Sequence, residues 1–323
     1  MSAINSTKLK TPSGELELLQ CLPESSGSRP AILCLHGAFC SAHDFQFLLP
    51  YFSSRGFPAY ALSLRGHGNS WAPSTLRMHL TSLDGHVDDI GIALDHISEK
   101  HVSAVIPPIL IGHSFGGGHL QYFLSRLGKN HVASPDEKHR VSALVLLASA
   151  PISGGGKEIM ANWEQVETQG KGYKYPWSPR SQLETVAQVR KAFFQDATNV
   201  ATIEKWHSEC RTKAEGIRAG LAVLWPFGEA SDVLAALSGI EEHGVGRKVL
   251  HIAAGRDCLV TPSMVEENTL AYQKAVGSSP DTSQTVMSIV IEDSAHHLMM
   301  DIAWAECAKK VADWVELRDI SKP

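Results

Sequence analysis

Residues 109–120 read ILIGHSFGGGHL. An apolar, strand-like run ends at Gly112, a serine follows between His113 and Phe115, and three glycines precede a helical pattern. Residues 112–116 fit G-x-S-x-G, in which the serine occupies a strained strand-to-helix turn whose neighbours must lack side chains. Such a turn exposes the serine hydroxyl beside a helix N-terminus, which stabilises negative charge. The pattern alone is weak, because an ordinary glycine-rich turn reads the same way.

Short apolar segments alternate with amphipathic helical patterns along most of the chain. The strand candidates are residues 31–35, 59–64, 109–111, 143–148, 248–253 and 285–291. Most of them are continuously apolar, which is typical of parallel strands that are covered on both faces. After the serine, Leu120, Phe123, Leu124 and Leu127 repeat with helical spacing. We therefore expect an α/β fold with a doubly wound, mostly parallel sheet.

Residues 151–245 interrupt this alternation. They contain no convincing strand, they read as largely helical, and they carry much of the aromatic content of the chain. We expect them to form a helical cap, or lid, inserted into a core domain made of residues 1–150 and 246–323. A cap over a binding site must touch the bound molecule, so Trp163, Trp177 and Phe194 are candidate substrate contacts.

A serine nucleophile needs a base, and the base needs an orienting carboxylate. Asp257 follows the strand candidate 248–253, and the adjacent His296 and His297 follow the one at 285–291. Both loops therefore lie at the carboxyl ends of predicted strands. The order serine, acid, histidine is the one expected on this kind of sheet.

A fourth feature follows the first strong strand. Gly37 lets the backbone turn there, so that the backbone N–H of Ala38 can face the nucleophile. The N–H of Phe115, directly after the serine, can donate to the same oxygen. Four features at the ends of four predicted strands favour a Ser-His-Asp enzyme.

With these features, the sequence resembles the α/β-hydrolase superfamily over nearly all of its length, and in particular its esterase-like and lipase-like members with a helical cap. The matching stretches are HGAF at 36–39, LRGHGNS at 64–70, GHSFGG at 112–117, GRDCLVTP at 255–262 and DSAHHLMMD at 293–301. By position, the resemblance implies that Ser114 is the nucleophile, Asp257 the orienting acid and His296 the base. It also implies that the backbone N–H groups of Ala38 and Phe115 form the oxyanion hole.

Two positions depart from the family pattern. Families of this kind often end the triad with Gly-His, apolar residues and an acid, and AHHLMMD aligns best with His296 as the base. A shift by one residue would make His297 the base, so that alternative stays open. Ser63 stands where relatives often have aspartate before LRGHG, which we interpret as a structural change in the loop.

The resemblance implies a serine hydrolase that cleaves a carboxylic ester or thioester of a small-to-medium, mostly apolar substrate through an acyl-enzyme. The same triad can serve a C–C bond hydrolase, a lactonase, an amidase or an acyltransferase, and a ligand receptor on a hydrolase scaffold is a further alternative. Epoxide hydrolases and haloalkane dehalogenases are disfavoured, because relatives of those types have aspartate where Ser114 stands.

Composition excludes several other classes. The formal charge is −5 and no basic block is present, so we expect a small-molecule substrate and no nucleic-acid partner. We expect no cofactor and no metal, because neither a dinucleotide motif nor HExxH occurs. The six cysteines form no CxxC pair, no leader or membrane-length apolar run is visible, and the final SKP is a poor peroxisomal signal. We therefore expect a cytoplasmic protein.

Overall fold

The structure is a computed structural model that describes residues 3–25, 29–101, 106–133, 141–166, 174, 178, 180–209, 215–242, 245–277, 282–318 and 320. Its main feature is an eight-stranded sheet with the order β1-β2-β4-β3-β5-β6-β9-β10. The strands are β1 Asn5–Thr11, β2 Gly14–Cys21, β3 Ile32–Leu35, β4 Ala59–Ser63, β5 Ile109–His113, β6 Ala143–Leu147, β9 Val249–Ala254 and β10 Val286–Ile291. Neighbouring strands from β4 to β10 run parallel. The predicted mostly parallel sheet is confirmed.

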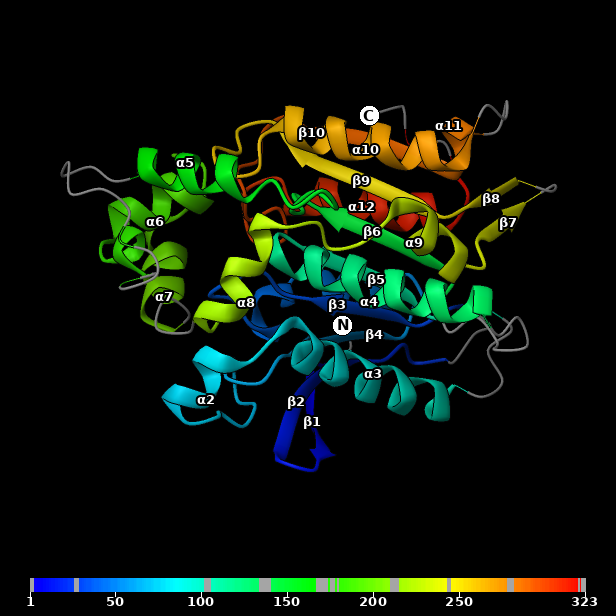
Figure 1. Cartoon of the computed structure of the whole chain (residues 1–323), viewed down its shortest axis with the longest axis horizontal. Helices are drawn as coiled ribbons and strands as arrows, with labels where there is room; N and C mark the ends of the chain where they lie inside the picture. The colour runs from blue at the N-terminus through cyan, green and yellow to red at the C-terminus, as the bar shows by residue number, and fades with distance from the viewer. Residues whose placement is uncertain are drawn as a thin grey trace.

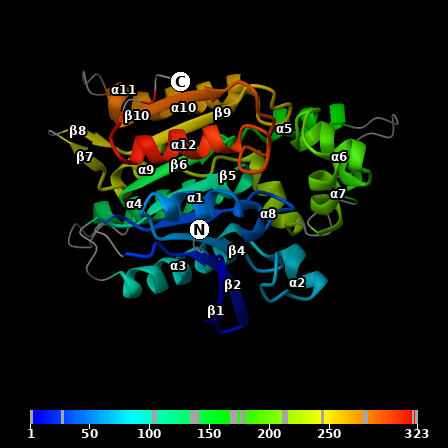
Figure 2. The ribbon, with the colours of Figure 1, turned by 180° about the vertical axis from the view of Figure 1, so that it is seen from behind.

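Helices cover both faces of this sheet. One face carries α3 (Leu83–Lys100), α4 (Phe115–Ala133), α9 (Ala230–Ala236) and α10 (Pro262–Val276) (Figure 1). The opposite face carries α1 (Leu48–Ser54) and α12 (Trp304–Val315), as Figure 2 shows. Buried apolar side chains form a separate core on each face, which explains why the central strands are apolar on both sides.

A second group of helices gathers at the carboxyl ends of the parallel strands (Figure 1). It comprises α2 (Thr75–Leu80), α5 (Gly156–Val166), α6 (Val186–Phe193), α7 (Val200–Glu209) and α8 (Ile217–Leu221), with the 3-10 turns η2 (Ser181–Leu183) and η3 (Ala222–Leu224). All except α2 lie in the segment between β6 and β9. We expect this segment to form a cap domain with the bounds 151–245, and this stays a prediction.

The structure contains two hairpins that the predicted strands do not include. β1 and β2 form an antiparallel hairpin that extends the sheet at one edge, with β2 antiparallel to β4. Within the segment expected to lack strands, β7 (Ile240–Glu242) pairs with β8 (Val245–Arg247). In β1 only Leu9 is buried, so this strand lacks the continuous apolar run that marks the central strands. The remaining elements are η1 (Ala42–Phe45) and α11 (Thr282–Thr285). Among the described residues, no helix has the length and hydropathy that crossing a bilayer requires.

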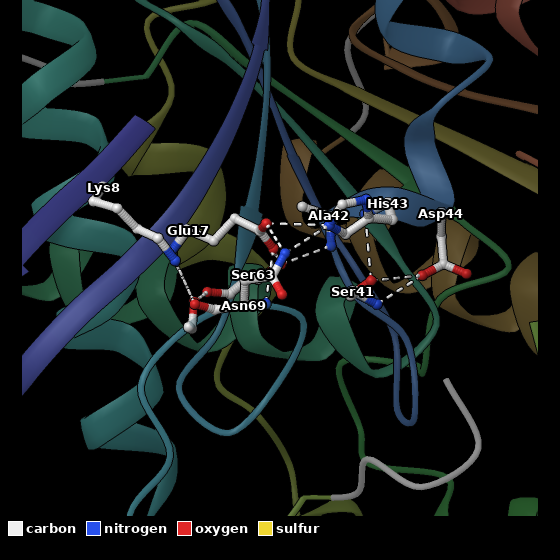
Figure 3. A network of polar contacts seen from close by, with 9 residues as sticks. Lys8, Glu17, Ser41, Ala42, His43, Asp44, Ser63 and Asn69 are labelled. Carbon is white, nitrogen blue, oxygen red and sulfur yellow. Dashed lines mark hydrogen bonds and ion pairs between the residues drawn. The ribbon is translucent and has the colours of Figure 1, made fainter. Parts of the chain in front are cut away.

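Glu17 on β2 explains the unusual Ser63. The Glu17 carboxylate accepts hydrogen bonds from the Ser63 hydroxyl at 2.8 Å, from the Asn69 backbone at 3.0 Å and from the Asn69 amide at 2.6 Å. Ser63 in turn accepts a bond from the backbone N–H of Ala42 at 3.0 Å, as Figure 3 shows. The carboxylate therefore comes from the neighbouring strand, and it holds together the loops after β3 and β4.

The Glu17 carboxylate should contribute measurably to stability. Burial raises its pKa, but hydrogen bonds from His43, Asn69 and Ser63 outweigh burial and lower the pKa to about 2. A depressed pKa means that this stabilisation is present above the unfolded-state pKa of about 4.5 and is lost as the pH falls towards 2. Glu17→Gln should lower the free energy of unfolding by about 2 kcal/mol at pH 7, measured by urea titration.

Glu15, on the same strand, is exposed and serves as the matched control. Glu15→Gln should change the free energy of unfolding by less than about 0.5 kcal/mol. Equal effects of the two substitutions would contradict a stabilising role for the Glu17 network.

Candidate active site

Ser114 occupies the turn between β5, which ends at His113, and α4, which begins at Phe115. Its φ angle is 52°, a left-handed conformation that non-glycine residues rarely adopt. The flanking glycines permit the turn, because a Cβ on Gly116 would lie 2.2 Å from the carbonyl oxygen of His36. The strained turn that the sequence predicts is therefore present, and it presents the Ser114 side chain at the end of the central strand.

Three side chains from separate loops form one hydrogen-bonded chain. His296 Nε2 lies 2.8 Å from Ser114 Oγ, and His296 Nδ1 lies 2.6 Å from Asp257 Oδ2. The other carboxylate oxygen of Asp257 accepts the backbone N–H groups of Leu259 at 2.8 Å and Val260 at 3.0 Å. These bonds fix the carboxylate, which can hold the imidazole with its Nδ1 protonated and its Nε2 free to accept from the serine.

The adjacent His297 lies in a different environment. Its Nε2 lies 3.0 Å from Asp44 Oδ1, which also accepts the indole N–H of Trp206 at 2.7 Å. The ring packs against the side chains of Phe193 and Phe194 at centroid distances of 5.2 Å. The structure therefore brings His296, and not His297, to Ser114.

Polar contacts hold the loop that carries His296. The ring of His113 donates a hydrogen bond from Nε2 to the backbone carbonyl of His296 at 2.9 Å, and burial keeps the pKa of His113 well below its usual value. Asp301 accepts the backbone N–H of Ala295 at 2.6 Å and the hydroxyl of Thr198. Asp301 is the acid that closes the AHHLMMD motif, and here it ties that loop to the stretch between α6 and α7.

The oxyanion candidates Ala38 and Phe115 line the same cavity as Ser114 and His296. Phe115 is the first residue of α4, so its backbone N–H has no partner within the helix. The loop before Ala38 is fixed by His36, which donates to the carbonyl of Gly37 at 2.8 Å and accepts from the backbone N–H of Leu64 at 3.1 Å. Burial and the charge of His67 lower the pKa of His36 to about 4, so the ring stays neutral. A neutral ring has one nitrogen that donates and one that accepts, as these two hydrogen bonds require.

The cavity beside Ser114 has a volume of about 100 Å³ and is mostly apolar. Of the three cap candidates, Trp163 lines it. Phe194 is buried against His297 and is not among the lining residues, and Trp177 lies outside the described residues. The lining residues that were not predicted include Phe193, whose ring stacks on His296 at 5.7 Å, and Glu215, which precedes the short α8.

One buried group combines side chains of the kind that ligate metals. Cys40, Asp44 and His297 are the residues of this kind that come together within the described ranges. The Asp44 carboxylate also accepts the backbone N–H of Ser41 at 2.6 Å and the indole N–H of Trp206, so its oxygens are already engaged. This arrangement fits a hydrogen-bond network better than a metal site.

The family model of the alpha/beta hydrolase family matches residues 32–314. The chain belongs to this family. Among curated proteins it is similar to the bifunctional esterase/perhydrolase DCH of Acinetobacter calcoaceticus, at 27% identity over 130 residues, which are 40% of this chain and 44% of that protein. It is also similar to the monoacylglycerol lipase of Mycolicibacterium smegmatis, at 32% identity over 90 residues, 28% of this chain and 30% of the lipase.

The curated relatives are matched over less than half of their own lengths. Among solved structures, an esterase from Thermogutta terrifontis superimposes with a TM-score of 0.62 at 17% identity, over 97% of this chain and 98% of that one. At this level of identity the structural match shows the alpha/beta hydrolase fold alone. The family, together with its esterase and lipase relatives, supports a hydrolase.

Proposed function

We propose that this alpha/beta hydrolase is a serine esterase that cleaves a carboxylic ester or thioester through an acyl-enzyme. The observation that carries the proposal is the chain of hydrogen bonds in which His296 reaches Ser114 at 2.8 Å and Asp257 at 2.6 Å. A serine hydroxyl is a weak nucleophile until a base takes its proton, and these distances allow that transfer.

In the proposed reaction, Ser114 Oγ attacks the carbonyl carbon while His296 Nε2 takes the hydroxyl proton. The negative oxygen that forms is stabilised by the backbone N–H groups of Ala38 and Phe115. His296 then gives the proton to the leaving alcohol or thiol, which departs and leaves an acyl group on Ser114. Water, activated by His296, attacks the acyl group and regenerates the serine, and Asp257 holds the imidazole throughout.

The residues around the cavity support a mostly apolar substrate. We propose that segment 151–245 forms the cap and that its Trp163 and Phe193, with Leu259 from the core, contact the acyl or alcohol group. The names of the curated relatives, an esterase/perhydrolase and a monoacylglycerol lipase, favour an ester over the other bonds that this triad can cleave.

A fluorophosphonate probe tests the nucleophile directly, because it phosphonylates an activated serine. We expect the wild-type protein to be labelled and Ser114→Ala to show no labelling, with loss of p-nitrophenyl ester turnover in parallel. A series of acyl chain lengths would then measure the size of the pocket.

The matched control is Ser208→Ala, which removes an exposed serine of α7 and should leave labelling as in the wild type. Labelling that persists in folded Ser114→Ala would contradict the assignment of the nucleophile. Labelling of Ser114 without turnover of any ester would favour one of the alternatives: cleavage of a C–C, lactone or amide bond, acyl transfer, or a ligand receptor.

A further inference from the structure

Glu215 is the one acidic side chain among the residues that line the cavity beside Ser114, within the part of the chain that the structure describes. Only 9% of its surface is exposed. Apart from Ser114 and His296, the other lining residues are apolar or glycine. A carboxylate in such a place is costly to bury unless it has a use or a partner, so its contacts need an explanation.

His67 is the partner of Glu215. Its ring is buried, its Nδ1 donates to the backbone carbonyl of Arg65 at 3.1 Å, and its Nε2 lies 3.2 Å from Glu215 Oε1. Burial by itself raises the pKa of Glu215, but the charge and proximity of His67 outweigh it and hold this pKa below its usual value. Glu215 is therefore ionised at neutral pH.

The pair with His67 does not use up the carboxylate. An ionised carboxylate has two oxygens and about four acceptor positions; His67 Nε2 approaches Oε1 at 3.2 Å, and the backbone N–H of Glu215 also donates to the carboxylate. The remaining positions can accept hydrogen bonds from a group in the cavity. The oxygens of an ionised carboxylate cannot donate a hydrogen bond, so the site would reject a negatively charged group or a group that only accepts hydrogen bonds.

The backbone around Glu215 fixes its position. Gly216 begins the turn into α8, and a Cβ there would lie 1.7 Å from the carbonyl oxygen of Met78, so this backbone packs directly on the end of α2. The cavity itself, at about 100 Å³, is smaller than the engineered cavity of about 150 Å³ that holds benzene in another protein. The part of the substrate that enters this cavity is therefore a short group.

We infer that Glu215 is a specificity-determining residue which selects a short substrate group bearing a hydroxyl, by accepting its hydrogen bond inside the cavity. This inference rests on the proposed function and narrows it from mostly apolar esters to hydroxyl-bearing ones. The hydroxyl belongs to either the acyl or the alcohol part of the ester, and the test distinguishes the two.

Two isosteric pairs of esters test the inference, because each pair differs only in a hydroxyl replaced by a methyl group. The acyl pair is p-nitrophenyl 3-hydroxybutanoate against p-nitrophenyl 3-methylbutanoate. The alcohol pair is 2-hydroxypropyl butanoate against 2-methylpropyl butanoate. Each kcat/KM is divided by the rate of alkaline hydrolysis of the same ester, which removes differences in intrinsic reactivity.

We expect the wild type to prefer the hydroxyl member of one pair by about 10-fold or more, because a site that binds a hydroxyl rejects the analogue that lacks it. Glu215→Met, of similar length but apolar, should abolish that preference or reverse it. The control Glu204→Met removes an exposed carboxylate of α7 and should keep the preference.

The wild-type comparison needs no variant to fold. If the wild type hydrolyses both members of both pairs equally well, the inference is wrong while the esterase proposal stands. If folded Glu215→Met keeps the wild-type preference, the inference is wrong as well. If the wild type hydrolyses no ester and takes no fluorophosphonate label, the proposed function fails and the inference fails with it.

Discussion

Replacing His296 by glutamine is expected to lower kcat/KM for ester hydrolysis by about 10⁴-fold or more. The reason is that His296 lies between the serine and the carboxylate, 2.8 Å from Ser114 Oγ and 2.6 Å from Asp257 Oδ2, where it can take the serine proton. Initial rates with p-nitrophenyl butanoate measure the loss, and circular dichroism confirms that the variant is folded.

His297→Gln is the matched control for this prediction, because it makes the same change one residue later. It should keep kcat/KM within about 10-fold of the wild type, since His297 contacts Asp44 and aromatic rings rather than Ser114. Its cost should be in stability, about 1–3 kcal/mol, because the buried Asp44 carboxylate loses a partner. A larger rate loss in His297→Gln than in His296→Gln would make His297 the base.

Acid is expected to unfold this protein well above pH 3, because several buried histidines are neutral in the folded state. Burial is the main cause that lowers the pKa of His36 and His119 to about 4 and that of His251 to about 3. In the unfolded chain each has a pKa of about 6.5. The stabilisation is therefore complete above pH 6.5 and is lost as the pH falls towards the folded-state values.

Near pH 5, each of these histidines should lower the free energy of unfolding by about 1.4 kcal/mol for every unit by which the pH falls. Together they cost about 4 kcal/mol per pH unit, against a total stability of about 5–15 kcal/mol for an ordinary protein. His43, whose pKa is raised by hydrogen bonding to Glu17, opposes only part of this loss. Urea titrations between pH 7 and pH 4.5, followed by circular dichroism, measure the slope.

His251→Leu isolates one titrating group. It removes a fully buried ring on β9 that packs edge-to-face against Tyr272, and it should reduce the slope of stability against pH by about 1.4 kcal/mol per pH unit. Tyr272→Phe is the control: it removes a hydroxyl bonded to Gln121 from the same contact but changes no group that titrates between pH 4.5 and 7. An unchanged slope in His251→Leu would contradict the prediction.

Most of the fold could be predicted from the sequence because its central strands are buried on both faces. A strand such as β6 is buried and apolar at every position, and this continuous apolar run can be recognised without knowing which strands lie beside it. The β1–β2 hairpin was missed because polar and charged residues interrupt the apolar ones along both strands, so neither shows a continuous apolar run. Its alternation of charged and apolar residues around a Pro-Ser-Gly turn was the available signal.

The candidate site could be predicted as far as chain order and strand ends determine it. The serine, acid and histidine loops follow parallel strands, so the topology itself brings them to one edge. The choice between His296 and His297 depended on packing, since the partners of His297 come from η1 and α7. Glu215 carried no pattern: it precedes a five-residue helix, and its partner His67 lies in a distant loop.

The buried carboxylate of Asp44 limits how the segment 151–245 can be exchanged between relatives. This one side chain, in the loop after β3, binds Trp206 from that segment and His297 from the loop after β10. A chimera that brings in a foreign segment without a donor at the position of Trp206 would leave a buried anion short of a partner. A chimera that folds well will need its residue at position 44 and its segment 151–245 taken from the same parent.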